Sequence, residues 1–376
     1  MKRILLSLLA LFLLPLPGRA VEINGKSAVL MDVATGTVLF EEHPNEKLAP
    51  ASVTKVMTML LIMEAVDDGR IAMTDMVTAS ETAAAKGGSQ VYLKVGETMA
   101  VEEMLKSIAV SSANDCACAM AEHIAGSESA FVEKMNEKAA QLGMTDTHFV
   151  NCTGLDDGAD AANHRTSAKD IALMSRELLK HHPKIKQFTT IWMDTIRGGT
   201  FGLSNTNKLI RFYPGATGLK TGFTSGAGYC LSATAEREGL ELIAVVMGAE
   251  TSAKRNESCK QLLDYGFANY ALFSPTLEEV PAVSVKLGKA DSVSLRMGEE
   301  GQLLVEKARK SGISSEITTE AEVSAPVTKG QQLGTMTVKD GEKILKEVPL
   351  TAAEDVPRLT FTDLAVKVLK RAAMAR

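Results

Sequence analysis

Ser52 and Lys55 have residue types and a spacing that could support covalent chemistry. They form the only Ser-x-x-Lys tetrad of the chain, and positions i and i+3 share one face of a helix. A serine hydroxyl becomes a nucleophile when a neighbouring base removes its proton. A lysine amine can be that base if burial or nearby cations lower its pKa. The tetrad therefore predicts a serine nucleophile with a lysine base. By itself, however, it also fits a helix start that carries a surface lysine.

Two more short motifs follow, and each occurs once. They are Ser112-Ala113-Asn114, in a break between two predicted helices, and Lys220-Thr221-Gly222, on a predicted strand. Together with Ser52-x-x-Lys55 they have the order and rough spacing found in serine acyltransferases that react with penicillin. All three motifs together are much less probable by chance than any one of them. Their joint occurrence therefore favours an acyl-transfer enzyme.

Acyl transfer from a peptide needs a nucleophile, a base, a proton donor for the leaving amine and groups that hold the substrate. Ser112 is the candidate that relays a proton to the departing amine. The Asn114 amide can hold the substrate backbone, because it carries both a donor and an acceptor. Lys220 and Thr221 can bind a carboxylate, and Gly222 can let the substrate lie close to the strand edge.

An oxyanion hole needs two N–H groups that point at the developing negative charge. The candidates are the backbone amides of Ser52 and Phe223, because Ser52 is the nucleophile and Phe223 directly follows the Lys-Thr-Gly motif. No step of this chemistry needs a metal or an organic cofactor, and none is expected.

Longer stretches resemble the D-alanyl-D-alanine carboxypeptidases among the low-molecular-mass penicillin-binding proteins. The resemblance runs from about Ala28 to Tyr270 and is looser beyond. It rests on these stretches: Ala28-Val-Leu-Met-Asp32, Pro50-Ala-Ser-Val-Thr-Lys-Val-Met-Thr58, Phe149-Val-Asn-Cys-Thr-Gly-Leu155, His164-Arg-Thr-Ser-Ala-Lys-Asp170, Gly218–Gly228 and Ile243–Ala249.

This resemblance implies removal of the terminal D-alanine from peptidoglycan stem pentapeptides through an acyl-Ser52 intermediate, inhibition by β-lactam antibiotics, and a role in cell-wall biogenesis and cell shape. It also implies that Arg255, shortly after the Met-Gly-Ala strand, helps to bind the terminal carboxylate. Some family members have histidine where this chain has Phe223, which bears on fine substrate preference and not on the backbone amide.

Three alternatives share parts of this pattern. A class A β-lactamase would be expected to carry a Glu-x-x-Leu-Asn motif for deacylation, and this chain has none. A catalytically silent wall-binding scaffold of the same fold is disfavoured by the three intact motifs. A cross-link-cutting DD-endopeptidase cannot be separated from a carboxypeptidase by these motifs.

Apolar periodicity predicts both helices and strands. The resemblance implies that they form an α+β fold, with an antiparallel sheet flanked by helices as in β-lactamases and transpeptidases. A hairpin is expected at Lys26–Glu41, and residues 151–163 are expected to form a loop. The expected helices are Val53–Val66, Val101–Ile124 with a break at Ser111–Asn114, Ser127–Leu142, Ser167–Lys180 and Ser252–Tyr270. The expected sheet strands are Leu219–Thr224, Tyr229–Ala235 and Leu240–Gly248.

The chain has 376 residues, and its composition changes near Phe273 from helical spacing to alternation. We expect a peptidase domain at 21–273 and a small all-β sandwich at 274–356. Asp340-Gly341 between two alternating runs predicts a hairpin in that second domain.

The N-terminus predicts export. Met-Lys-Arg precedes an apolar run and a small-residue cleavage site, which is the pattern of a secretory signal peptide at 1–20. Its removal takes away three basic residues and makes the net charge −8 instead of −5. A nucleic-acid partner is not expected, since the basic patch that binds phosphates is missing.

The last segment, 357–376, predicts an amphipathic helix. Phe361, Leu364, Ala365, Val368 and Ala372 fall on one side at 100° per residue, and basic residues fall on the other. We expect this helix to lie on the outer face of the cytoplasmic membrane, the alternative being a terminal helix that docks on its own domain.

The remaining candidates have simpler interpretations. Five cysteines, an odd number, are interpreted as small buried residues, with neither a disulfide framework nor a metal site. His148 and His164 do not form a Ser-His-Asp triad, because the chain lacks a Gly-x-Ser-x-Gly elbow. His164 is expected to order a loop or to cap the helix that begins near Ser167.

Overall fold

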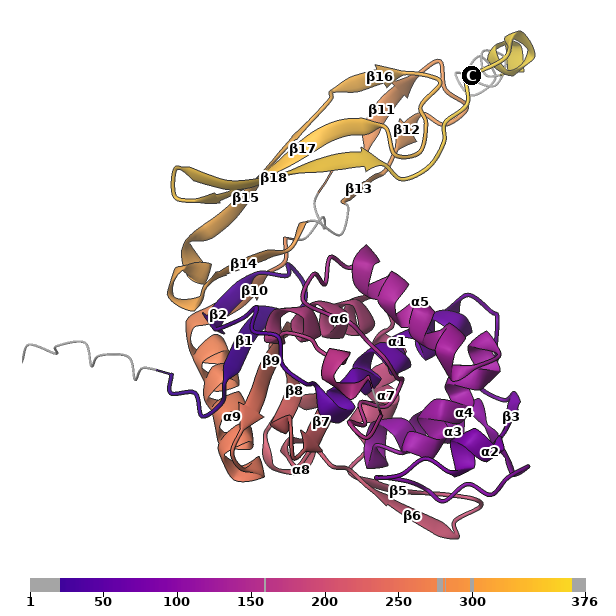
Figure 1. Cartoon of the computed structure of the whole chain (residues 1–376). Helices are drawn as coiled ribbons and strands as arrows, with labels where there is room; N and C mark the ends of the chain where they lie inside the picture. Colours follow the sequence, from indigo (N-terminus) through magenta and orange to yellow (C-terminus); the bar gives the residue numbers. More distant parts are fainter. Residues whose placement is uncertain (1–20, 159, 276–279, 281, 298–300, 367–376) are drawn as a thin grey trace, which may run out of the picture.

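The computed structural model describes residues 21–158, 160–275, 280, 282–297 and 301–366. The expected signal peptide lies outside the described residues, as do Val368 and Ala372 of the expected tail. An antiparallel five-stranded sheet forms the centre of the first part of the chain (Figure 1). Its strands, in spatial order, are β2 (Val38–Glu42), β1 (Ser27–Asp32), β9 (Leu240–Ala249), β8 (Gly228–Arg237) and β7 (Ala216–Thr224).

Both faces of this sheet are covered. Along β9, Ile243 and Val245 enter one hydrophobic cluster, whereas Leu242 and Ala244 enter another. Successive side chains of a strand point to opposite faces, so a strand buried on both sides has a continuous apolar run. One face packs on α9 (Ser252–Asn269) and the other on α6 (Ala168–His181) and the helical region (Figure 1). That region contains α1 (Lys55–Asp67), α2 (Glu81–Ala84), α3 (Val101–Ser111), α4 (Asn114–Ala125), α5 (Glu128–Gln141) and α7 (Lys186–Thr189). The short helix α8 (Leu209–Phe212) lies on the α9 side, where Leu209 enters the same hydrophobic cluster as Leu242.

The predicted hairpin, helices and sheet strands are confirmed to within three residues at their ends. Two antiparallel strand pairs were not predicted, because their strands have only three or four residues, too few positions to show a period. They are β3 (Met76–Thr78) with β4 (Thr98–Ala100), and β5 (Met193–Ile196) with β6 (Phe201–Ser204). The 151–163 loop is confirmed except for a 3₁₀ turn, η2 (Ala161–Asn163).

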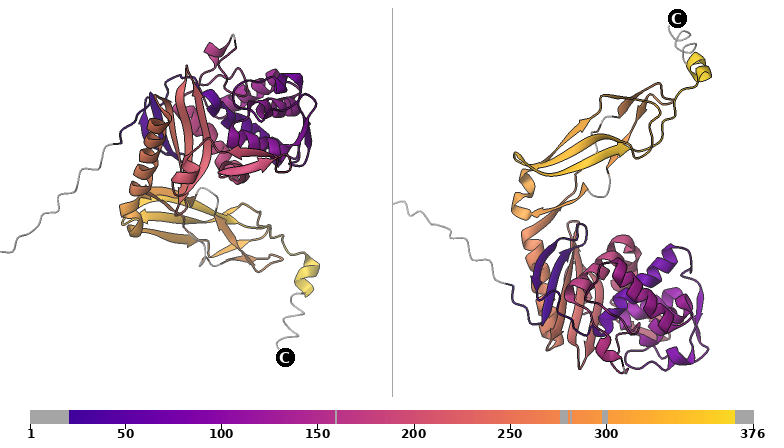
Figure 2. Two further views of the ribbon diagram at one scale, coloured as in Figure 1. Left: turned by 90° about the horizontal axis from the view of Figure 1, so that it is seen from below. Right: turned by 45° about the horizontal axis from the view of Figure 1, so that its top comes forward.

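The expected β-rich second part is also present, with a three-stranded and a four-stranded sheet (Figure 2). The hairpin predicted at Asp340-Gly341 joins its two longest strands. The three-stranded sheet has the order β12 (Ser292–Val293), β11 (Val283–Lys286), β16 (Glu322–Ser324), and the four-stranded sheet β13 (Leu295–Met297), β18 (Lys343–Ala352), β17 (Gln332–Asp340), β15 (Ile313–Thr319). One further pair, β10 (Tyr270–Phe273) with β14 (Leu303–Glu306), connects the end of α9 to this part.

The terminal helix begins later than predicted. Residues 357–360 are not helical, and Arg358 instead forms a β-bridge with Gly288. The described helical turn covers 361–366, because the Thr360 hydroxyl accepts a hydrogen bond from the Asp363 amide at 3.2 Å and caps it. This turn lies at the far end of the β domain from the helical region (Figures 1 and 2).

Candidate active site

The Ser52 and Lys55 side chains meet at the start of α1. Ser52 lies in a 3₁₀ turn, η1 (Ala51–Thr54), which precedes the helix, and Lys55 is the first residue of α1. Lys55 Nζ is 3.0 Å from Ser52 Oγ. A neutral amine at this distance can accept the hydroxyl proton, so the geometry suits a serine nucleophile with a lysine base.

Burial lowers the pKa of Lys55, which lets the amine act as a base. Its side chain is fully buried, and burial lowers its pKa to about 7, against the opposing influence of Cys152 and Asp115. Burial is the largest cause of this lowered pKa. Lys220 is a nearby cation, and burial, followed by the charges of Lys55 and Arg255, lowers the pKa of Lys220 well below its usual value.

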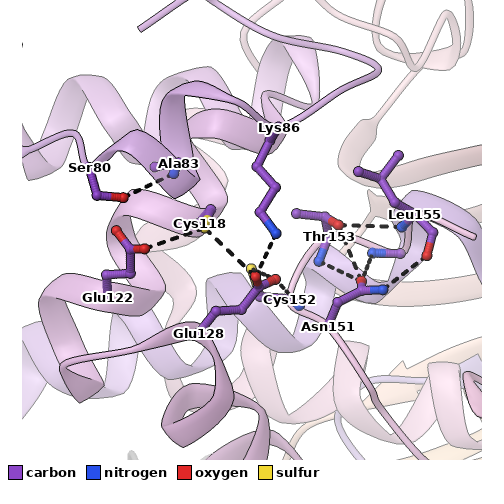
Figure 3. A network of polar contacts seen from close by, with 11 residues as sticks. Ser80, Ala83, Lys86, Cys118, Glu122, Glu128, Asn151, Cys152, Thr153 and Leu155 are labelled. Carbon is purple, nitrogen blue, oxygen red and sulfur yellow. Dashed lines mark hydrogen bonds and ion pairs between the residues drawn. The ribbon is translucent and has the colours of Figure 1, made fainter. Parts of the chain in front are cut away.

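A loop distant in sequence holds the Lys55 amine. Lys55 Nζ donates to the Thr153 carbonyl at 2.7 Å, and this leaves the amine's lone pair free for Ser52. Asn151 Oδ1 in turn accepts from the amides of Thr153 and Gly154, at 3.1 and 2.6 Å. The loop is therefore fixed by a side chain of its own, as Figure 3 shows.

The same loop is tied to the helical region by Glu128 (Figure 3). The Glu128 carboxylate accepts from the Cys152 amide at 3.3 Å and forms an ion pair with Lys86 at 2.5 Å. The thiols of Cys118 and Cys152 also face this carboxylate, at 3.8 and 3.2 Å. All five cysteines are buried and unbridged, which confirms their interpretation as small buried residues. The part of the chain that the structure describes holds no cluster of ligands for a metal ion.

Ser112 and Asn114 occupy the predicted break, between α3 and α4. Ser112 has a left-handed backbone with φ +64°, which ends α3 and is uncommon for a residue other than glycine. Asn114 Nδ2 donates to the Gly87 carbonyl at 2.7 Å. Among the described residues, Asn114 Oδ1 is the one buried side-chain oxygen or nitrogen without a hydrogen-bond partner. A buried acceptor of this kind is satisfied by a donor that the chain does not supply, either a water molecule or a substrate N–H.

Lys220 and Arg255 form a buried basic cluster. Their exposed fractions are 1% and 5%, and neither forms an ion pair with a carboxylate in the described chain. Lys220 Nζ donates to the Thr221 carbonyl at 2.9 Å, and the Thr221 hydroxyl to Thr206 Oγ1 at 2.7 Å. Buried cations without an anionic partner are costly, so this cluster suits an anionic ligand.

Gly222 is required for a different reason from the one predicted. A Cβ atom there would lie 2.7 Å from the Pro50 carbonyl oxygen and 3.1 Å from the Val53 amide nitrogen. A side chain would thus push β7 away from the turn that carries Ser52, rather than obstruct a substrate. The neighbouring Phe223 is 53% exposed and stacks on Tyr229, with ring centroids 4.3 Å apart. β7 is an edge strand, and an extended peptide can pair with such an edge beyond Gly218. At the start of the strand, the carbonyls of Thr217 and Gly218 already accept from Thr189 Oγ1 and Asn207 Nδ2.

Thr54 and His164 also support the site, which the sequence motifs do not indicate. His164 Nε2 lies 2.8 Å from Thr54 Oγ1, and His164 Nδ1 accepts from the Val150 amide at 3.1 Å. The expected ordering of a loop is therefore confirmed. The alternative, capping of α6, is wrong, because the Ser167 hydroxyl caps that helix by accepting from the Asp170 amide.

Comparisons with known proteins agree with this geometry. A family model described as D-alanyl-D-alanine carboxypeptidase matches residues 16–251, and one described as the C-terminal domain of penicillin-binding protein 5 matches residues 278–358. The D-alanyl-D-alanine carboxypeptidase DacF of Bacillus subtilis is 46% identical over 90% of this chain and 87% of its own length. DacC of Escherichia coli is 33% identical over 90% of this chain and 85% of its own length.

Solved structures show the same relationship. Penicillin-binding protein 5 of Haemophilus influenzae is 31% identical, with a TM-score of 0.71 over 90% of this chain and 98% of its own. Penicillin-binding protein D2 of Listeria monocytogenes, solved with ampicillin bound, is 31% identical, with a TM-score of 0.60 over 66% of this chain and all of its own. The chain belongs to the D-alanyl-D-alanine carboxypeptidase family of penicillin-binding proteins, and it is a serine-type carboxypeptidase.

Proposed function

We propose that Ser52 and Lys55 carry out the D-Ala-D-Ala carboxypeptidase reaction. Ser52 Oγ attacks the carbonyl carbon of the terminal D-Ala-D-Ala bond while its proton moves to Lys55. The tetrahedral intermediate breaks the C–N bond, and the departing D-alanine takes a proton through Ser112. Water then hydrolyses the acyl-Ser52 ester. The observation that carries the proposal is the contact of 3.0 Å between Ser52 Oγ and a lysine whose pKa is about 7.

The substrate's terminal carboxylate would bind at Lys220, Thr221 and Arg255. This assignment is supported by two buried cations that lack a carboxylate partner within the described residues. The peptide backbone would extend along the edge of β7, with Asn114 Oδ1 as acceptor for one of its N–H groups. The amides of Ser52 and Phe223 would stabilise the oxyanion. The peptidoglycan stem pentapeptide fits these requirements, since it ends in D-Ala-D-Ala and a free carboxylate.

A penicillin adduct tests the nucleophile. The protein without its first 20 residues is incubated with benzylpenicillin, and its intact mass is measured. We expect one penicilloyl group on the wild type and none on Ser52→Ala, because only the Ser52 hydroxyl can form the ester. A wild type without an adduct, or an adduct that survives the substitution, would contradict the assignment.

Two activity assays distinguish the alternatives. Release of D-alanine from a Lys-D-Ala-D-Ala peptide distinguishes an enzyme from a silent scaffold. Cleavage of a cross-linked dimer peptide would reveal endopeptidase activity.

We also propose that the protein is exported and lies peripherally on the outer face of the cytoplasmic membrane. Support comes from the signal-peptide pattern and from the exposed apolar face of the terminal helix, with Phe361 87% and Leu364 41% exposed. None of the described helices is long and apolar enough to cross a bilayer. Burying such a face at a lipid surface is favourable, and basic residues on the other side add attraction to anionic lipids.

Removal of residues 357–376 tests this location. We expect the shortened protein to leave the membrane fraction and to keep its acylation by penicillin, because the tail contributes no residue to the site. Phe361→Glu in the full chain is the matched variant, since it places a charge on the apolar face and leaves the chain length unchanged. An unchanged membrane fraction for both variants would refute the anchor.

A further inference from the structure

His164 connects two backbone segments that meet beneath the nucleophile. Its side chain is only 3% exposed and lies 5.7 Å, centroid to centroid, from the Phe149 ring. The Val150 amide donates to Nδ1 at 3.1 Å, and Nε2 faces Thr54 Oγ1 at 2.8 Å. Both ring nitrogens are therefore engaged, one with the loop and one with the turn that carries Ser52.

The partners determine the tautomer of His164. A backbone amide can only donate, so Nδ1 accepts and carries no proton. The proton of the neutral ring is on Nε2, which donates to Thr54 Oγ1. The Thr54 hydroxyl in turn donates to the Ala51 carbonyl at 2.8 Å. Three hydrogen bonds thus run in one direction, from Val150 through His164 and Thr54 to Ala51.

The charge state of the ring is consistent with this relay. Burial, followed by the nearby basic groups His148, Arg165 and Lys55, lowers the pKa of His164 to about 4. The ring is neutral at physiological pH, and a neutral ring is what an acceptor at Nδ1 and a donor at Nε2 require.

The last acceptor of the relay, the Ala51 carbonyl, belongs to the peptide unit that precedes Ser52. The carbonyl of Ala51 and the amide of Ser52 form one planar trans unit, so the direction of one determines the direction of the other. The turn is not a relaxed one, because Ala51 has φ +48°. On the other side, a Cβ atom at Gly154 would lie 1.8 Å from the Ala51 oxygen, so only glycine leaves room for this carbonyl.

We propose that His164 is a positioning residue that aims the Ser52 amide at the oxyanion. The inference rests on the proposed function, in which that amide stabilises the tetrahedral intermediate. His164 touches neither substrate nor nucleophile; it acts through Thr54 on the Ala51–Ser52 peptide unit. Without the Nε2 donor, the Thr54 hydroxyl is free to turn away from the carbonyl, and the strained unit can rotate.

Two substitutions of His164 distinguish the roles of its two ring nitrogens. In His164→Gln the amide nitrogen lies near the position of Nε2 and retains the donor to Thr54. In His164→Asn the amide oxygen lies near the position of Nδ1 and retains only the acceptor for Val150. We expect His164→Asn to slow acylation by benzylpenicillin about 10- to 100-fold, below the full loss of one oxyanion donor. His164→Gln should stay within about 3-fold of the wild type, with a similar decrease in melting temperature for both.

A peptide boronic acid gives a second measurement, because its tetrahedral Ser52 adduct places an oxygen where the oxyanion forms. His164→Asn should weaken boronate binding by the same factor as acylation and leave the KM for the peptide substrate nearly unchanged. Thr54→Val should behave like His164→Asn, and Thr54→Ser, which keeps the hydroxyl, should behave like the wild type. His148→Gln is the matched control, since His148 is an exposed histidine of the same region.

The inference is overturned if His164→Asn and His164→Gln lose acylation rate equally and if this loss follows the decrease in their melting temperatures. His164 would then have only a structural role. Acylation and boronate binding at the wild-type level in His164→Asn would also overturn it. Neither result touches the proposed function, which fails only if the wild type forms no Ser52 adduct.

Discussion

At the scale of single residues, the chemistry depends on Lys55 being partly neutral near pH 7. An exposed lysine would be almost fully protonated at this pH and could not accept the Ser52 proton. Burial of the whole side chain supplies the shift, and the one backbone acceptor, Thr153, is compatible with either protonation state. The base is therefore a consequence of the way the loop at 151–155 closes over α1.

This base predicts the pH dependence of acylation. Below its pKa Lys55 carries a third proton and has no lone pair, so the rate should rise with pH and reach half its maximum near pH 7. The measurement is the second-order rate constant for benzylpenicillin between about pH 5.5 and 8.5. Lys55→Arg is the matched variant, because it keeps the positive charge and stays protonated, and it should be inactive throughout. A rate that is flat across this range would show that Lys55 is not the base.

At the scale of elements, the site lies where an edge strand meets a helix start. The Lys-Thr-Gly strand β7 packs directly on η1, and at Gly222 a Cβ atom would lie only 3.1 Å from the Val53 amide nitrogen. Ser112 and Asn114 lie in the break between α3 and α4, where Ser112 ends the first helix and Asn114 begins the second. The distance between β7 and the nucleophile is thus set by the absence of one side chain.

Gly222→Ala tests this packing. The new Cβ would contact the Pro50 oxygen at 2.7 Å, and backbone atoms cannot move aside as a flexible side chain can. We expect a loss of about 1–3 kcal/mol in the free energy of unfolding, as for other overpacked sites, and a marked decrease in acylation. Gly226→Ala is the control, because its Cβ would meet nothing closer than Asp156 Oδ2 at 3.5 Å. Stability and acylation equal to those of the control would contradict the packing argument.

At the scale of the whole molecule, the site and the β domain are separate. All nine candidate site residues lie before Asn256, and the described contact between the two parts includes the β10–β14 pair. The Listeria relative that was solved with ampicillin matches only 66% of this chain. We interpret the β domain as a spacer that holds the peptidase region away from the terminal helix (Figure 2).

A protein that ends at residue 275 tests this separation. We expect penicillin acylation within about 3-fold of the full chain, because no residue of the site is removed, and a lower melting temperature, because β10 loses its partner strand. Acylation kinetics and thermal unfolding measure the two effects independently. A soluble, folded fragment that no longer acylates would show that the β domain contributes to catalysis.

The sequence by itself determined the elements and the main candidate residues of this protein. Ser52, Lys55, Ser112, Asn114 and Lys220 were found because motif spacing and apolar periodicity are local properties. Lys55 contacts Ser52 and its charge acts on Lys220, and the α+β fold with its β-rich second part is confirmed.

Only the tertiary structure decided the state of these residues. The pKa of Lys55, the unpaired oxygen of Asn114 and the contact of Gly222 with Pro50 all arise from packing between segments distant in the chain. Lys55 is held by a carbonyl 98 residues away, and Thr54 by an imidazole 110 residues away. Burial and hydrogen-bond direction depend on such long-range contacts, which no local pattern of residue types records.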